Sequence, residues 1–184
     1  MGKIVSNFFI SLDGVVESPD QWHFPYFNDE MGAAVESGVQ TASAMLMGRV
    51  LYQEWADYWP SAEDDFASYI NNVPKYVVST TLDRAHWNNT TVVSGDVAGR
   101  LEAIKADTEG DIAMSGSATT VRWLLANGLL DELRLLVHPI AVGHGQRLFE
   151  DDATYQLQLV NHEVFETGVL NLTYIPAPAA EPAA

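Results

Sequence analysis

Residues 111–125, DIAMSGSATTVRWLL, place a short apolar run, a glycine turn and an amphipathic pattern in immediate succession. Residues 111–115 predict a buried strand that ends at Gly116. Ser117 is a typical N-cap residue, and apolar residues recur at helical spacing from Val121 onward. A strand that leads directly into a helix favours a parallel α/β arrangement.

The same succession occurs several times before this stretch. Strands are predicted at 3–11, 43–47, 75–79 and 91–94, and helices over 29–37, 50–57, 61–71 and 97–106. Gly38 is expected to end the first helix and Ser61 to cap the third. The first two thirds of the chain therefore predicts βαβ units around a parallel sheet.

After residue 128 the pattern changes to strands alone. Strands are predicted at 132–138, 156–166 and 169–175, and the last two are expected to pair as a hairpin across Thr167 and Gly168. The predicted fold is a three-layer α/β fold with a mixed, mostly parallel central sheet, flanking helices and a C-terminal antiparallel hairpin. Residues 1–175 are expected to form a single domain, and the Pro/Ala tail at 176–184 is expected to be disordered.

The composition excludes several classes of function. The 184 residues include 25 acidic and 9 basic side chains, a formal net charge of −16, so neither nucleic acid nor an anionic membrane is an expected partner. The absence of cysteine excludes disulfides and thiolate chemistry, and the five histidines show no metal-ligand spacing, so no metal is expected. The N-terminus has no signal-peptide pattern, which indicates a cytoplasmic protein.

Three predicted strand ends carry small, polar or cationic residues that suit phosphate. These are Gly48 and Arg49; Ser79 and Thr80; and Gly116, Ser117, Ala118 and Thr119. Glycine lets phosphate approach the backbone, helix N-termini offer free N–H groups, and arginine offers bidentate donors. Because parallel strands end at one edge of a sheet, the three junctions together predict a dinucleotide site. Each junction alone is explained more readily by a tight turn, an ordinary N-cap or a surface ion pair.

Several short motifs, in this order, resemble the dihydrofolate reductase-like family. They are SLDGVVE at 11–17, MGR at 47–49, SGS at 115–117, VHP at 137–139 and GHG at 143–145. Within that family the chain is most similar to the branch that contains the reductase domain of bacterial riboflavin biosynthesis and stand-alone bacterial homologues. The resemblance spans about residues 3–175 and implies a dihydrofolate reductase-like fold, NADPH as hydride donor and a homodimer.

The resemblance also implies roles for individual residues. The three junctions would hold the cofactor, and Ser11, Asp13 and Gly14 would lie beside the nicotinamide and the substrate. Arg49 would favour NADPH over NADH because it meets the extra phosphate. Phe27 stands where dihydrofolate reductases carry the carboxylate that binds the pterin ring, which leaves the substrate open.

The reduction of a C=N or C=O bond needs a proton donor besides the hydride. Asp13 is the first candidate and Asp29 the second, although Asp13 with Gly14 is also an ordinary turn signature. Trp22, Phe24 and Phe27 could cover a planar, heterocyclic substrate, or could instead belong to the core or to a dimer contact. The sequence thus predicts an NADPH-dependent reductase of a small molecule. The alternative is a non-catalytic ligand-binding or dimerisation module with the same fold.

Overall fold

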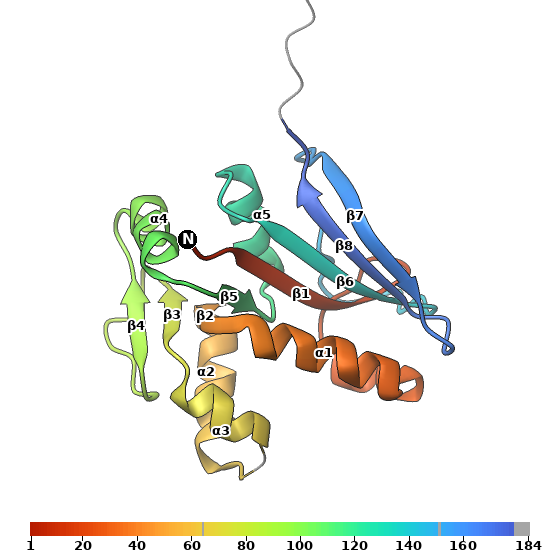
Figure 1. The fold of residues 1–184 in the computed structure, drawn as a ribbon, viewed down its shortest axis with the longest axis horizontal. Helices are drawn as coiled ribbons and strands as arrows, with labels where there is room; N and C mark the ends of the chain where they lie inside the picture. The colour runs from red at the N-terminus through yellow and green to blue at the C-terminus, as the bar shows by residue number, and fades with distance from the viewer. Residues whose placement is uncertain (64, 151, 179–184) are drawn as a thin grey trace, which may run out of the picture.

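The computed structural model describes residues 1–63, 65–150 and 152–178. Its centre is an eight-stranded sheet with the strand order β4-β3-β2-β5-β1-β6-β8-β7 (Figure 1). The strands are β1 (Ile4–Ser11), β2 (Ala42–Gly48), β3 (Lys75–Val78), β4 (Thr90–Val93), β5 (Asp111–Met114), β6 (Glu132–His138), β7 (Leu157–Val164) and β8 (Leu170–Pro176). The helices are α1 (Asp29–Thr41), α2 (Arg49–Tyr58), α3 (Asp65–Asn72), α4 (Val97–Asp107) and α5 (Ala118–Ala126), with 3-10 helices η1 (Pro19–Gln21), η2 (Phe24–Tyr26) and η3 (Trp59–Ser61).

The strand directions confirm the predicted mixed sheet. The pairs formed by β1 with β5 and β6, by β2 with β3 and β5, and by β3 with β4 are all parallel. β8 runs antiparallel to both β6 and β7, so the C-terminal hairpin extends one edge of a parallel sheet. The C-terminal ends of β1, β2 and β5 therefore lie along the same edge.

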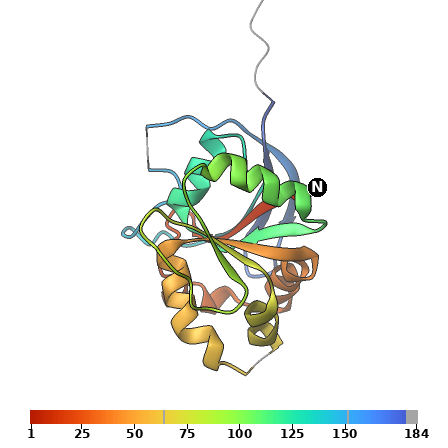
Figure 2. The same cartoon turned by 90° about the vertical axis from the view of Figure 1, so that its left-hand side faces the viewer.

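Helices cover both faces of the sheet and complete three layers. Figures 1 and 2 show α4 and α5 on one face and α1, α2 and α3 on the other. The core under α4 and α5 includes Leu101, Leu124 and Leu133. The core on the opposite face, under α2 and α3, includes Tyr52 and Ile70.

Two predicted helix boundaries were wrong. The first helix does not end at Gly38, because α1 continues to Thr41 and β2 begins at the next residue. Gly38 instead faces the sheet, where a side chain would touch Arg134. Ser61 does not cap the third helix, since it ends the short helix η3 and α3 begins at Asp65.

The end of the predicted domain lies close to the end of the sheet. β8 extends to Pro176, and residues 179–184 of the predicted tail lie outside the described residues. The division into one domain and a tail stays a prediction. Within the described ranges, no helix has the length and apolar character that a membrane crossing requires.

Candidate functional site

Two of the three predicted junctions meet at the edge of the sheet. β2 ends at Gly48 and α2 begins at Arg49, while β5 leads through residues 115–117 into α5. Because β2 and β5 are neighbours in the sheet, the two turns touch. A Cβ on Gly48 would lie 2.9 Å from Thr120 Oγ1 and 3.1 Å from Ser117 Oγ. Only glycine allows this approach without moving a neighbour.

The junction at residues 116–119 presents the N-terminus of α5. Ser117 is the N-cap, and its Oγ lies 2.9 Å from Thr120 Oγ1 and accepts a hydrogen bond from the Thr120 N–H at 3.4 Å. Gly116 has a φ of 96°, which favours glycine, and the Gly116–Ser117 peptide bond is cis. The first N–H groups of α5, at Ala118 and Thr119, have no partner within the helix and carry a partial positive charge. This end of α5 can bind an anion.

A large cleft lies at this edge of the sheet, and Arg49 lines it whereas the junction at Ser79 and Thr80 does not. Arg49 is exposed at the start of α2 and donates through Nη1 to Gln53 Oε1 at 2.8 Å. Ser79 is buried, and its Oγ accepts hydrogen bonds from the N–H groups of Thr81 and Leu82. Neither Ser79 nor Thr80 lines the cleft. The structure thus brings the junctions at Gly48 and at Ser117 together and leaves the junction at Ser79 and Thr80 outside the cleft.

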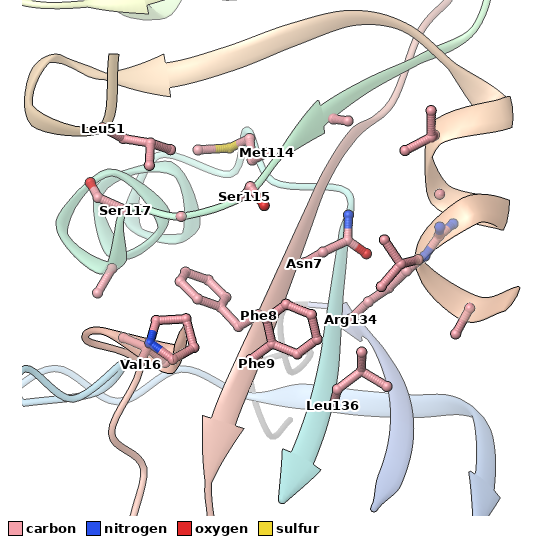
Figure 3. Close-up of a pocket in the computed structure, with 18 of the residues that line it drawn as sticks. Asn7, Phe8, Phe9, Val16, Leu51, Met114, Ser115, Ser117, Arg134 and Leu136 are labelled. Carbon is pink, nitrogen blue, oxygen red and sulfur yellow. The ribbon is translucent and has the colours of Figure 1, made fainter. Parts of the chain in front are cut away.

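The cleft has a volume of about 2040 Å³ and extends from these junctions to the space beneath α1. A pocket for one drug-sized ligand is usually about 300–1,000 Å³, so this cleft has room for a dinucleotide and a second molecule. Figure 3 shows Ser117 and Leu51 on one side of it and Asn7, Arg134 and Leu136 on the other. We call these the junction half and the α1 half.

The two candidate proton donors do not line the cleft. Asp13 accepts hydrogen bonds from Ser11 Oγ at 2.6 Å and from the N–H groups of Val142 at 2.9 Å and Gly143 at 2.8 Å. The Ser11 hydroxyl, followed by these two N–H groups, lowers the pKa of Asp13 to about 2, so the carboxylate is ionised at neutral pH. Asp29 is an exposed residue in the first turn of α1.

Asp13 and its neighbours hold two loops together. The Asp13 carbonyl accepts a hydrogen bond from Arg147 Nε at 3.0 Å, and its carboxylate lies 3.6 Å from Arg147 Nη2. Gly14, with a φ of 87°, forms the turn, and the Ser11 hydroxyl accepts a hydrogen bond from the N–H of Val15. These contacts join the loop after β1 to the loop after β6.

The aromatic residues surround two histidines that the sequence reasoning missed. Trp22 is buried with its ring 5.2 Å from that of His138, while Phe24 and Phe27 are exposed; none of the three lines the cleft. The His23 ring stacks on Phe9, a cleft residue, at 4.6 Å. Burial lowers the pKa of both histidines. In the sequence, Trp22 and Phe24 flank His23, whereas His138 has no aromatic neighbour, so local sequence offered a signal for only one of the two histidines.

Asn7 and Arg134 were also missed, although the sequence held a signal for them. Asn7 is followed by three apolar residues in β1, Arg134 stands between Leu133 and Leu135 in β6, and the register of the two strands places Asn7 and Arg134 opposite each other. Their pairing depends on contacts 127 residues apart in the chain, which strand patterns cannot predict. Among the described residues, no group of three or more metal-ligating side chains is present.

The sheet order, the cleft at its edge and the hairpin define a fold of the dihydrofolate reductase class. A family model of the RibD C-terminal domain matches residues 2–171, and the chain belongs to that family. The chain is 26% identical over 179 residues to the uncharacterized protein YyaP of Bacillus subtilis (strain 168), covering 94% of each.

Two solved structures confirm the fold. A putative riboflavin biosynthesis protein from Shewanella sp. PV-4 superimposes with a TM-score of 0.79 at 18% identity, covering 97% of this chain and 100% of the other. Dihydrofolate reductase from Enterococcus faecalis, complexed with NADP(H) and RAB-propyl, superimposes with a TM-score of 0.65 at 16% identity, covering 96% and 98%. Membership of a family with reductase domains supports a reductase-type fold for this chain.

Proposed function

We propose that this protein is an NADPH-dependent reductase that transfers a hydride to a C=N or C=O bond of a small molecule. The observation that supports this best is the contact between Gly48 and the capped N-terminus of α5 at one end of a cleft large enough for two ligands. The structural neighbour that is complexed with NADP(H) supports the choice of cofactor.

The residues of the junction half fit a dinucleotide phosphate. Gly48 leaves the approach to α5 open, and the N–H groups of Ala118 and Thr119 would bind phosphate oxygens. Arg49 would pair with the extra phosphate of NADPH. When bound, the reduced nicotinamide supplies the hydride. Arg49, Ala118 and Thr119 all line the cleft.

Asp13 is better suited to positioning than to proton donation. Its pKa of about 2 keeps it ionised at neutral pH, where it cannot donate a proton. We infer that it holds the loops that border the cleft, through the N–H groups of Val142 and Gly143.

A titration with nucleotides tests the proposed cofactor. NADPH at 100 times its dissociation constant should raise the free energy of unfolding by about 2.7 kcal/mol. Arg49→Ala should weaken NADPH more than NADH, whereas Lys3→Ala, which removes a charge before the start of β1, should change neither affinity. An equal loss for both nucleotides would show that Arg49 does not bind the extra phosphate.

Turnover separates the reductase from a non-catalytic binding module. The absorbance of reduced nicotinamide can be followed with dihydrofolate, a pyrimidine ribosylamine and quinones as acceptors. Consumption of NADPH with any of them supports the reductase. Tight binding without consumption would favour the binding module.

The homodimer stays a prediction. β7 is one of the two outer strands of the sheet, and its Leu159, Val160 and Val164 side chains are exposed. An unpaired strand edge can pair with a second copy of itself. Sedimentation of the protein and of a Val160→Lys variant would measure whether a dimer forms and whether it uses this edge.

A further inference from the structure

Two buried histidines lie where the loop after β1 meets the sheet. We call residues 18–27 of this loop, which contain η1 and η2, the flap. His23 lies between the two short helices and is 7% exposed, while His138 ends β6 and is fully buried. Their ring centroids are 6.1 Å apart, and the ring planes are almost perpendicular. The proposed reductase function uses neither histidine.

The surroundings of both rings suit neutral imidazoles. His138 Nδ1 lies 2.8 Å from the carbonyl oxygen of Leu136, which can only accept, so Nδ1 carries a proton and Nε2 is a bare acceptor. Within the described ranges, neither His138 Nε2 nor His23 Nδ1, both buried, has a hydrogen-bond partner. Protonation of either nitrogen would therefore bury a charge and a donor without an acceptor in hydrogen-bonding geometry.

The flap is attached to the sheet by packing and not by hydrogen bonds. Across the part of the chain that the structure describes, every hydrogen bond of residues 18–27 stays within the flap or joins it to Glu17. Both ends are fixed, since the Glu17 carboxylate accepts from the N–H of Gln146 at 2.6 Å and Asn28 caps α1. The middle of the flap can therefore move without breaking a hydrogen bond to the sheet.

Ring contacts join the flap to the sheet, and within the described ranges each of them includes a histidine. The rings of Trp22 and Tyr26 lie 5.2 and 5.7 Å from that of His138, measured between centroids. The His23 ring stacks on that of Phe9 at 4.6 Å. A charge on His23 would therefore fall at the centre of the surface that holds the flap in place.

Burial opposes a charge on either histidine. Burial, followed by the nearby His138, lowers the pKa of His23, although the carboxylate of Asp20 in η1 acts in the opposite direction. Burial also lowers the pKa of His138, against the backbone carbonyls of Leu136 and Ile10, which favour its charged form. His23 is the one of the two that has a carboxylate to attract a proton, and it belongs to the flap.

The other ionisable side chains on the elements around the pair are engaged elsewhere or contribute only a ring. Tyr26 meets His138 with its ring. Glu30 of α1 already accepts two hydrogen bonds. Glu132 and Arg134 of β6 form an ion pair with each other, and β1 has no ionisable residue.

We propose that the flap is a pH-controlled wall of the cleft, closed over neutral His23 and opened when His23 takes up a proton. Residues 18–20 of the flap line the cleft. Phe9, on which His23 stacks, also lines it, beside Leu136 of the α1 half (Figure 3). Opening removes this wall, so a ligand that contacts it binds less tightly as the flap opens. His23 is thus a positioning residue, and the opening itself does not depend on the proposed reductase function.

The direction of the pH dependence follows from proton linkage. In the open flap the His23 imidazole is in water, with an ordinary pKa of about 6.5, and in the closed flap its pKa is lower. The closed flap therefore binds fewer protons, is fully stable above about pH 6.5, and loses stability as the pH falls toward the lower pKa. The opening constant should rise by up to about tenfold per pH unit over this range.

Hydrogen exchange followed by NMR tests the opening. The indole N–H of Trp22, in the flap, should lose about tenfold in protection between about pH 6.5 and about pH 5.5. The indole N–H of Trp87, held in the core under α2, is the matched control and should keep its protection. His23→Phe retains an aromatic ring and should remove most of the fall. His162→Gln, which changes an exposed histidine of β7, should leave it intact.

A second variant and a nucleotide test the sensor and the wall. Asp20→Asn, at an exposed position, removes the attraction for the proton and should move the fall in Trp22 protection to lower pH. NADP⁺ at 100 times its dissociation constant should raise Trp22 protection at about pH 5.5 by up to about a hundredfold, because it favours the closed flap. This last expectation rests on the proposed function.

The proposal fails if Trp22 protection in the wild type is constant over this pH range, if Trp87 loses protection in parallel, or if folded His23→Phe keeps the full fall. A fall that Asp20→Asn moves to higher pH would also contradict it. Binding of NADP⁺ without any gain in Trp22 protection would show that the flap is not a wall of the cofactor site. Absence of NADP⁺ binding would instead overturn the proposed cofactor, and the exchange of the nucleotide-free protein is a separate measurement. The thermal midpoint of every variant confirms that it is folded.

Discussion

Replacing Gly48 by alanine should disrupt the junction half of the cleft without straining the backbone at residue 48. Gly48 has a φ of −79°, which alanine adopts readily, so the perturbation comes from the added methyl group alone. That group would lie 2.9 Å from Thr120 Oγ1 and 3.1 Å from Ser117 Oγ, which are themselves 2.9 Å apart. At least one hydroxyl must move away.

The stability change follows from the contacts that are lost. The hydroxyl pair is a neutral hydrogen bond, which contributes about 0.5–1.5 kcal/mol. Disturbing the Ser117 N-cap costs about 1 kcal/mol more. The lower entropy of the unfolded alanine chain offsets about 0.4–1 kcal/mol. We therefore expect Gly48→Ala to lower the free energy of unfolding by about 1 kcal/mol and to weaken NADPH about tenfold or more.

Gly32→Ala is the matched control because it makes the same chemical change inside α1. The nearest atoms to a Cβ at Gly32 are on the Phe27 ring at 3.9 Å, an ordinary contact, so this variant should gain about 0.5–1 kcal/mol. Urea unfolding measures both stabilities, and a fluorescence titration measures the NADPH affinity. If Gly48→Ala gains as much stability as Gly32→Ala and binds NADPH like the wild type, the close approach of the two junctions has no role.

Three other predictions concern charge. Lys75 is fully buried and donates through Nζ to the carbonyls of Ile70 at 2.7 Å and Val73 at 2.8 Å. Lys75→Met leaves these carbonyls without their donor and should lower the free energy of unfolding, measured in urea, by about 2–4 kcal/mol. A decrease below about 1 kcal/mol would contradict this. Burial and the nearby His138 lower the pKa of His23 below 6.5, so its contribution to stability is full above pH 6.5 and is lost as the pH falls through the lower folded pKa. His23→Phe should therefore flatten the fall in urea midpoint below pH 6.5, and an unchanged slope would exclude His23 as its cause. Because the net charge of −16 repels the cofactor, NADPH affinity should rise as salt increases from about 0.01 to about 0.1 M, where the Debye length falls from about 30 to about 10 Å; a steady decrease over this range would show that local attraction dominates.

Local patterns predicted most of the elements but missed details that depend on distant contacts. Gly38 was predicted to end α1 because glycine commonly follows a helix. In the structure it continues the helix and lies against Arg134, a contact between residues 96 positions apart. Asp13 was a candidate proton donor because it follows β1, yet it lies outside the cleft lining, and hydrogen bonds from Ser11 and from the distant Val142 and Gly143 keep it ionised. The contacts to Arg134, Val142 and Gly143 come from distant segments, which local patterns do not reveal.

The sequence by itself determined the alternation of strands and helices, the change to an antiparallel hairpin, and the glycine and serine turns at Gly48 and Ser117. These follow from periodicity and turn chemistry, which act over a few residues. Only the tertiary structure decided which turns meet and which polar side chains share a cleft. The strand order places β2 beside β5 and β1 beside β6, so it joins Gly48 to Ser117 and Asn7 to Arg134. Strand order results from packing the whole chain around one sheet, and no local pattern encodes it.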